Sequence, residues 1–175
     1  ITDGGGPVAV AGVMGGLESE VTDQTVDVLL ESANFDFISV RRTSAALRIP
    51  SEAAQRFGRG VDPELTVVAL RRACELMCSL AGGTVAKGFA DNYPKKAPQK
   101  TIPFRISEVK RLLGISLSPA EVQEMLGRLD FACEQVPGEE TTFHVQVPSY
   151  RLDVSIPADL VEEIARLYGY DRLPS

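Results

Sequence analysis

The chain has no tryptophan, one histidine and three cysteines among its 175 residues, and it contains no long apolar run. Three cysteines without a pairing pattern do not make a disulfide-stapled scaffold and fit a reducing compartment such as the cytoplasm. A membrane-spanning helix needs roughly 18–20 apolar residues in succession, so we expect no membrane segment. The net charge of −6 excludes a strongly basic nucleic-acid-binding surface, so any contact with RNA or DNA must be local.

The composition is that of a folded globular protein. Apolar residues make up 44% and charged residues 24% of the chain, which excludes extensive disorder. The length allows one domain or two small ones. The chain begins with Ile1 rather than Met and shows no signal peptide, which indicates a piece of a larger protein. The polar segment 92–98 contains two prolines and predicts a boundary between domains at 1–94 and 95–175.

The first predicted domain mixes strands and helices. Short apolar runs predict three strands, at residues 8–13, 26–31 and 84–90. Amphipathic segments predict three helices, at residues 36–47, 51–59 and 63–81. Asp36 and Ser51 stand at the start of the first two helices and are expected to cap them.

The helix predicted at 63–81 has the clearest pattern of this domain. Apolar residues recur there every three or four positions, Pro63 suits the first turn, and Gly82 ends the helix. The periodicity places Leu76 at the centre of an apolar face that we expect to be buried. Arg72 falls on the solvent side of the same helix.

The second predicted domain has the order strand, helix, helix, hairpin and helix, which resembles a small winged-helix arrangement. Residues 102–106 alternate between apolar and polar and predict a strand, and Ser107 is expected to cap the helix that follows. Ser118 begins a capping box with proline at the first helical position. A last helix is predicted at 157–168. The fold class expected for both domains is α+β.

The most informative polar cluster is acidic. On the last helix Asp159, Glu162, Glu163 and Arg166 fall on one stripe, opposite the apolar side chains, and Asp153 arrives from the preceding loop. Hard oxygen ligands grouped in this way suit Mg²⁺. An ordinary helix start is the alternative, with acids favoured by the helix dipole and a pair between Glu162 and Arg166.

Other candidate residues have weaker signals. Glycines 15–16 form either a phosphate cradle or a tight turn, and the motifs of known phosphate loops are absent. Glu31 ends an apolar run, where a half-buried carboxylate needs a partner or a polar ligand. His144 lies on the polar side of its strand without nearby partners. Cys74 and Cys78 are four residues apart on a predicted helix. They are either core residues or half of a metal site.

Five stretches together resemble the bacterial phenylalanyl-tRNA synthetase beta-subunit family: GVMGG at 12–16, VLLESA at 28–33, RGVDPEL at 59–65, VPSYRLD at 147–153 and DLVEEIARLYGYD at 159–171. They occur in the family's order and span nearly the whole chain. The resemblance implies that residues 1–94 are the C-terminal part of the editing domain, which hydrolyses tyrosine wrongly attached to tRNA(Phe). It implies that residues 95–175 are the following winged-helix-like domain, a structural and magnesium-binding part of the synthetase.

The resemblance also assigns site residues. The family's magnesium ligands match four acidic residues, Asp153, Asp159, Glu162 and Glu163, in a site completed by the alpha subunit. The family's editing pocket matches four residues, Gly15, Glu31, Ser51 and Ala53. In that pocket Glu31 can accept the phenol proton of tyrosine, and the small Ala53 leaves room for the ring.

The working enzyme of this family is a cytoplasmic α₂β₂ tetramer that acts on tRNA(Phe). Its ATP-dependent aminoacylation occurs in the alpha subunit, so the resemblance implies no catalytic residue of the synthetic reaction in this chain and no ATP bound by it. We therefore expect the isolated piece to be inactive.

Two alternatives from other functional classes stay open. A non-catalytic nucleic-acid-binding or assembly module would use the second domain as winged helices do. Its second helix carries Glu121 and Glu124 against Arg128, which disfavours phosphate binding. A free-standing editing hydrolase would act on mischarged tRNA without an alpha subunit.

Overall fold

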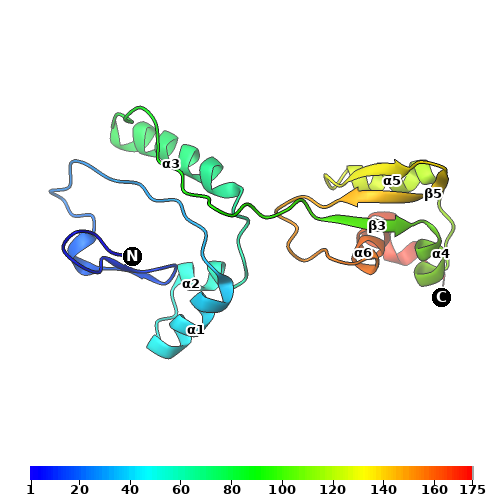
Figure 1. The fold of residues 1–175 in the computed structure, drawn as a ribbon, viewed down its shortest axis with the longest axis horizontal. Coiled ribbons are helices and arrows are strands. Elements are labelled where there is room, and N and C mark those ends of the chain that lie inside the picture. Colours follow the sequence, from blue (N-terminus) through cyan, green and yellow to red (C-terminus); the bar gives the residue numbers. More distant parts are fainter. Residues whose placement is uncertain (175) are drawn as a thin grey trace. The chain divides into compact units, whose positions relative to one another are not determined.

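The computed structural model describes residues 1–174. The chain divides into two compact units, residues 1–90 (unit 1) and 91–175 (unit 2), so the division falls just before the proline-containing segment 92–98 (Figure 1). Each unit contains helices and strands, and the predicted α+β class is confirmed. None of the helices formed by the described residues is long and apolar enough to cross a membrane.

Unit 1 contains the three predicted helices. They are α1 (Phe37–Leu47), α2 (Glu52–Phe57) and α3 (Leu65–Ala81). The predicted caps are confirmed: Asp36 accepts a hydrogen bond from the Ser39 backbone N–H at 2.8 Å, and the Ser51 hydroxyl accepts one from that of Ala54 at 3.0 Å. Helix α3 begins two residues after Pro63, at Leu65, and Gly82 ends it as expected.

The strands of unit 1 are fewer and shorter than predicted. Only β1 (Ala9–Val10) and β2 (Met14–Gly15) form among its described residues, as an antiparallel pair, followed by the 3₁₀ helix η1 (Leu17–Ser19). The predicted strands at 26–31 and 84–90 are wrong. Val26 and Leu29 are 90% and 100% exposed, so their segment has an apolar composition but no neighbouring strand to pair with.

The hydrophobic core of unit 1 is small. Val13, Val40 and Ala54 are buried, and the rings of Phe35 and Phe57 meet edge to face beside them at 5.0 Å. Helix α3 buries none of its side chains, and Leu76 is 41% exposed. The expected burial of Leu76 is therefore wrong, because periodicity identifies an apolar face but not what covers it.

Two glycines have little free space around them in the β1–β2 region, one between the two strands and one directly after β2. Gly12 has φ +66°, and a Cβ there would lie 2.9 Å from side-chain atoms of Phe35 and Val40. A Cβ on Gly16 would lie 2.6 Å from the Val8 carbonyl oxygen. At Gly15, between them, a Cβ would meet no atom within 4 Å.

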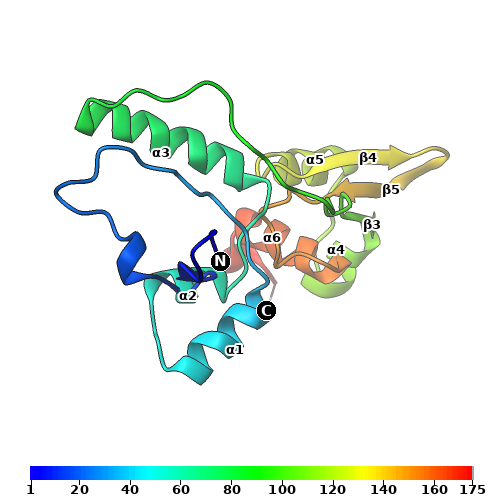
Figure 2. The same cartoon turned by 60° about the vertical axis from the view of Figure 1, so that its left-hand side comes forward.

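Unit 2 has the predicted order of elements. It contains β3 (Thr101–Arg105), α4 (Ser107–Leu113), α5 (Pro119–Gly127), β4 (Ala132–Val136), β5 (Glu139–Gln146), α6 (Pro157–Tyr168) and the 3₁₀ helix η2 (Tyr170–Arg172). The strands form an antiparallel sheet of order β3-β5-β4, with the β4–β5 hairpin clear in Figure 2. The capping box of Ser118 with Glu121 is confirmed. The predicted Ser107 cap is wrong, because Ile106 holds the cap position without a side-chain bond.

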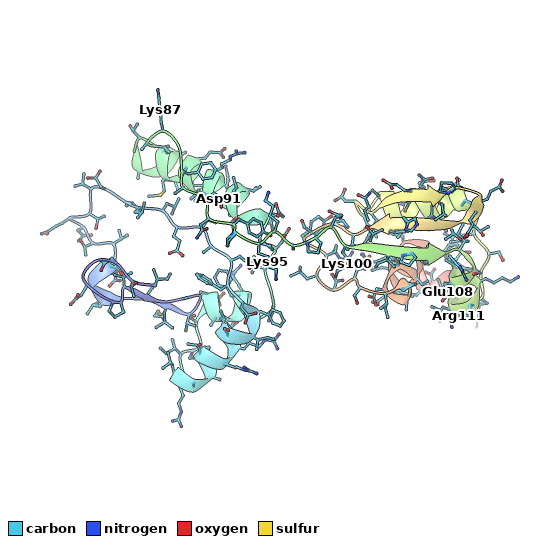
Figure 3. All side chains as sticks on the ribbon, viewed as in Figure 1. Lys87, Asp91, Lys95, Lys100, Glu108 and Arg111 are labelled. Carbon is cyan, nitrogen blue, oxygen red and sulfur yellow. The ribbon has the colours of Figure 1, made fainter. Side chains whose placement is uncertain are left out.

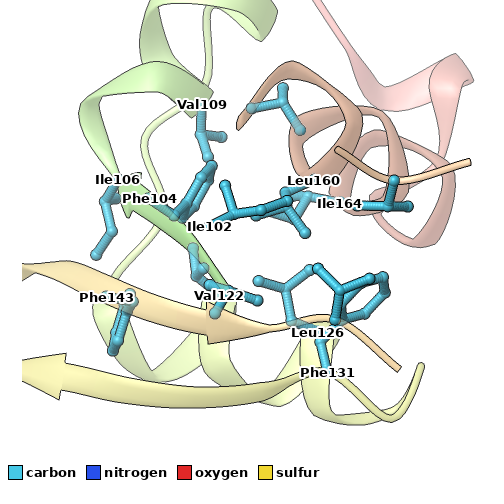
Figure 4. Close-up of a cluster of buried hydrophobic side chains, with 14 residues drawn as sticks. Ile102, Phe104, Ile106, Val109, Val122, Leu126, Phe131, Phe143, Leu160 and Ile164 are labelled. Carbon is cyan, nitrogen blue, oxygen red and sulfur yellow. The ribbon is translucent and has the colours of Figure 1, made fainter. Parts of the chain in front are cut away.

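One face of this sheet carries the core of unit 2. Along β3 and β5 the inward side chains are buried, including Ile102, Phe104, Phe143 and Val145, and the alternate ones point outward. Helix α6 packs against β3, α4 and α5 through Leu160 and Ile164, which have no exposed surface (Figure 4). The bounds predicted for α6 are those observed, and it is the element that positions the acidic cluster.

Candidate functional site

The loop between β5 and α6, residues 147–156, is held in place by buried and polar contacts. The Val154 side chain is buried, and its carbonyl oxygen accepts a hydrogen bond from Lys100 Nζ at 2.8 Å. Lys100, just before β3, is labelled in Figure 3. At the start of the loop the Val147 carbonyl accepts from Gln99 Nε2 at 2.8 Å. Both ends of the loop are thus anchored to the segment that leads into β3.

Arg151 is the centre of this loop's polar contacts. Its Nε and Nη2 donate to the two carboxylate oxygens of Asp153 at 2.9 and 2.6 Å, and Nη2 also donates to Glu163 Oε1 at 2.7 Å. The guanidinium carbon lies 5.5 Å from the centre of the Phe131 ring, a cation–π distance. Only 17% of the Arg151 side chain is exposed. Arg151 is not among the predicted site residues, although its position two residues before Asp153 was a usable signal.

Glu163 is a buried carboxylate on α6, with 7% of its surface exposed. Burial raises its pKa, but hydrogen bonds from Arg151 and then Arg166 outweigh burial and leave the pKa below its usual value. The hydrogen bond from Arg151 likewise lowers the pKa of Asp153. Because Arg166 pairs with Glu163, the alternative pair between Glu162 and Arg166 is not the one observed.

Asp159 closes the start of α6. Its Oδ2 accepts hydrogen bonds from the backbone N–H groups of Ser155 and Ile156 at 2.6 and 3.0 Å, and these bonds lower the pKa of the carboxyl. This is the helix-start role that the spacing left open as an alternative. Glu162 is exposed and makes no hydrogen bond or ion pair with any described residue.

The four predicted magnesium ligands do not surround one point. Asp153 and Glu163 converge on Arg151, one oxygen of Asp159 faces backbone N–H groups, and Glu162 faces solvent. No group of three or more potential ligands among residues 1–174 is arranged to hold a metal ion. The set fits Mg²⁺ in its chemistry, since all four are oxygen donors, but binding through Asp153 and Glu163 requires Arg151 to release them.

Two of the four predicted editing residues, Ser51 and Ala53, lie at the start of α2. The Ser51 hydroxyl donates to the Val13 carbonyl, which places the start of α2 beside β2 and so near Gly15. Ala53 is half-buried in the first turn of α2. The Ser51 hydroxyl thus makes two structural hydrogen bonds: it caps α2 by accepting from the Ala54 N–H, and it donates to the Val13 carbonyl just before β2.

Glu31 lies on an extended segment that contacts the start of α3. It is exposed, so the half-buried carboxylate that we expected there is wrong. Its neighbours Ser32 and Asn34 donate side-chain hydrogen bonds to the carbonyls of Thr66 and Val61 at 2.7 and 2.6 Å. These bonds fix the extended chain around Glu31 beside the start of α3. Glu31 makes no hydrogen bond or ion pair with Gly15, Ser51 or Ala53, all of which are described residues.

The remaining candidates form no site. An open hollow runs along α3, lined by residues of that helix and of the segment 85–89, and it includes Cys74 and Cys78 but none of the predicted editing residues. Both thiols are free. His144 is exposed on the outer face of the sheet, between Pro103 and Glu134 of the neighbouring strands.

Comparison with known proteins assigns each unit to a family model. Residues 1–82 match the B3/4 domain, and residues 102–170 match the tRNA synthetase B5 domain. Over 174 residues the chain is 52% identical to the phenylalanine–tRNA ligase beta subunit of Moorella thermoacetica, and over 175 residues it is 46% identical to that of Desulfotalea psychrophila. These alignments cover 99% and 100% of the chain and 21% of each relative, so the chain spans about a fifth of their length.

Proposed function

The chain belongs to the family of phenylalanine–tRNA ligase beta subunits, and from this premise we propose that it works as a segment of the enzyme that attaches phenylalanine to tRNA(Phe) with ATP. The observation that carries this proposal is the identity of about half the residues along the whole chain, with the B3/4 and B5 matches in succession. Phenylalanine activation and ATP binding are assigned to the alpha subunit. The partners proposed are that subunit, in a cytoplasmic α₂β₂ tetramer, and tRNA(Phe).

Unit 1 is proposed to contribute to the hydrolytic editing of tyrosyl-tRNA(Phe). The residues proposed for the pocket are Gly15, Glu31, Ser51 and Ala53. In support, Ser51 and Ala53 open α2 next to β2, and Glu31 presents a free carboxylate that can accept the tyrosine hydroxyl. A pocket that offers this acceptor disfavours phenylalanine, which leaves the acceptor without a donor.

Unit 2 is proposed to contribute carboxylates to a Mg²⁺ site completed by the alpha subunit. Asp153, Asp159, Glu162 and Glu163 would hold the ion. In support, Glu162 is free, and the hydrogen bonds that Asp159 accepts from described residues all go to Oδ2. When bound, the ion would supply positive charge that neutralises carboxylates where the subunits meet. The role of this chain's residues is structural, and none of them takes part in the synthetic reaction.

The experiment that tests the proposal uses the full-length beta subunit purified together with its alpha subunit. We expect the complex to charge tRNA(Phe) with phenylalanine and to deacylate tyrosyl-tRNA(Phe). As Mg²⁺ is removed, a beta subunit with Asp159→Asn and Glu163→Gln should release the alpha subunit at a higher remaining Mg²⁺ concentration than the wild type does. Sedimentation measures this release. Charging without any deacylation would contradict the editing role, and unchanged assembly of the double variant would contradict the magnesium role.

The nucleic-acid-binding alternative gains no support from the geometry of α5. Glu121 is tied to Ser118 in the capping box, and Glu124 on the same helix adds a second negative charge against Arg128. A helix with this charge balance repels phosphate groups. The proposal therefore keeps unit 2 as a structural part of the synthetase.

A further inference from the structure

Arg151 has more contacts than an ordinary loop arginine. It holds both oxygens of Asp153, one oxygen of Glu163 and the face of Phe131, and its side chain is 17% exposed. The loop around it is fixed independently, since the neighbouring Tyr150 hydroxyl donates to Asp130 Oδ2 at 2.6 Å. The loop that carries Arg151 is therefore also held by contacts outside the ionic cluster.

The position of the guanidinium is that of a cation between two carboxylates. Asp153 comes from the loop and Glu163 from the second turn of α6, so no backbone element holds their charged ends together. Two carboxylates that share a site without a cation repel each other strongly. Arg151 removes this repulsion, and because its planar fork engages Asp153 with two donors it also sets the orientation of that carboxylate.

We propose that Arg151 is a positioning residue that serves as the resident counter-cation of Asp153 and Glu163 and competes with a divalent ion for them. The inference rests on the proposed magnesium role of these carboxylates. Without an ion, Arg151 keeps both side chains in place. When an ion binds, the guanidinium gives up at least one carboxylate, so the chain alone binds the ion more weakly than its four carboxylates would without Arg151.

The matched variants follow from the contacts. Arg151→Met removes the charge, and with it the cation–π contact with Phe131, and keeps an unbranched apolar side chain. Arg151→Lys keeps the charge and loses the fork. Arg166→Met removes the same charge from the other side of Glu163, but Arg166 has a 52% exposed side chain and no contact with Asp153. It is the control for a general change of charge.

The measurement is a Mn²⁺ titration of the 175-residue chain in metal-free buffer, with free Mn²⁺ counted by electron paramagnetic resonance and Mg²⁺ added as competitor. The chain is a suitable sample because unit 2 encloses its own hydrophobic core. Arg151→Met should tighten Mn²⁺ binding by about tenfold, since it removes a unit charge within a few ångströms of the ion. Arg151→Lys should stay close to the wild type, and Arg166→Met should change binding by less than about threefold.

Thermal unfolding keeps the proposal testable if Arg151→Met is unstable. If added Mg²⁺ restores the thermal stability of Arg151→Met, the proposal is supported, because the ion then replaces the guanidinium. A variant that stays unfolded at millimolar Mg²⁺ overturns it, as do equal affinities of Arg151→Met and the wild type, or equal gains from Arg151→Met and Arg166→Met.

The same titration on the complex of full-length beta and alpha subunits separates the two proposals. If the wild-type complex binds no more Mn²⁺ than its Asp159→Asn, Glu163→Gln variant, the magnesium role fails and the competition falls with it. If the wild-type complex binds the ion at these residues and Arg151→Met changes nothing in either sample, only the role of Arg151 fails.

Discussion

The two units are of similar length, but they bury very different amounts of apolar surface. In unit 2 fourteen buried side chains form one core, whereas in unit 1 the core cluster has three. Unit 1 is not short of apolar residues: Leu65, Val68, Leu76 and Leu80 on α3 are all more than 40% exposed. An amphipathic pattern therefore stabilises a unit only where a second apolar face meets it.

The largest effect is expected for a core aromatic of unit 2. Phe104→Ala removes a ring without exposed surface and should lower the free energy of unfolding by about 3–5 kcal/mol. Leu80→Ala on α3 is the control: the Leu80 side chain is 83% exposed, so the loss should stay within about 0.5 kcal/mol. Urea unfolding followed by circular dichroism measures both. Equal losses would remove the contrast between the units.

The next effect concerns specificity in unit 1 rather than stability. Glu31 is exposed, so Glu31→Ala should leave the unfolding of the chain nearly unchanged. In the full-length subunit with its alpha partner it should weaken the preference of editing for tyrosine over phenylalanine by about 1–3 kcal/mol, through the lost acceptor. Deacylation of tyrosyl- and phenylalanyl-tRNA(Phe) measures this, with charging by phenylalanine expected to be normal.

Ala53→Trp tests the same pocket by filling it, and should abolish deacylation of tyrosyl-tRNA(Phe) without loss of charging. Glu18→Ala, which removes another exposed acid of unit 1, is the control and should edit like the wild type. The isolated 175-residue chain should not deacylate tyrosyl-tRNA, because it does not hold the mischarged end of the tRNA in position for hydrolysis. Normal editing by both Glu31→Ala and Ala53→Trp would show that the pocket lies elsewhere.

Acid should weaken unit 2 more than unit 1. The hydrogen bonds described above lower the pKa values of Asp153 and Asp159, and those to Glu163 outweigh its burial. The folded state then binds fewer protons than the unfolded state, so stability present above the unfolded pKa of about 4 is lost as pH falls through the folded pKa values.

Native-state hydrogen exchange resolved by peptide at several pH values measures this difference between the units. Protection of α6 should fall more between pH 6 and pH 3 than protection of α1, where Asp36 is the carboxyl with a lowered pKa. Asp159→Asn should reduce the pH dependence of α6. An equal fall in both helices would mean that the ionic contacts of unit 2 do not contribute to its stability.

The smallest effect is expected for Leu76→Ala. From the periodicity alone, which predicts a buried Leu76, the substitution should lower the free energy of unfolding by about 2–5 kcal/mol. Because 41% of Leu76 is exposed, the expected loss in this chain is about 1 kcal/mol or less. Denaturant unfolding that gave the larger value would show that the apolar face of α3 is covered in solution.

Prediction from the sequence succeeded where the cause of a structure is local. The bounds of α6 follow from Pro157, the apolar stripe and Gly169, all of which act within the helix itself. The Ser51 and Ser118 caps likewise involve residues three positions away. The strands predicted at 26–31 and 84–90 failed because pairing needs a partner that composition does not specify.

The candidate site was predicted less well for the same reason. Helical spacing allowed Arg166 to pair with Glu162 or Glu163, and the pair observed is with the buried Glu163, which also accepts a hydrogen bond from Arg151. Spacing could not show that Arg151 reaches Asp153 and Glu163, because that contact depends on how the loop is anchored to Lys100. Whether the eight assigned residues act in magnesium binding and editing remains a prediction.

The three glycines in and just after the β1–β2 pair separate what the fold requires from what a ligand would require. At Gly12 and Gly16 any side chain would collide with the core or with the Val8 carbonyl, so a library of substitutions should lose all variants at both positions by misfolding. At Gly15 a side chain would enter open space. If selection for editing in the full subunit still retains only glycine at position 15, that intolerance comes from the bound tRNA end and marks where it lies.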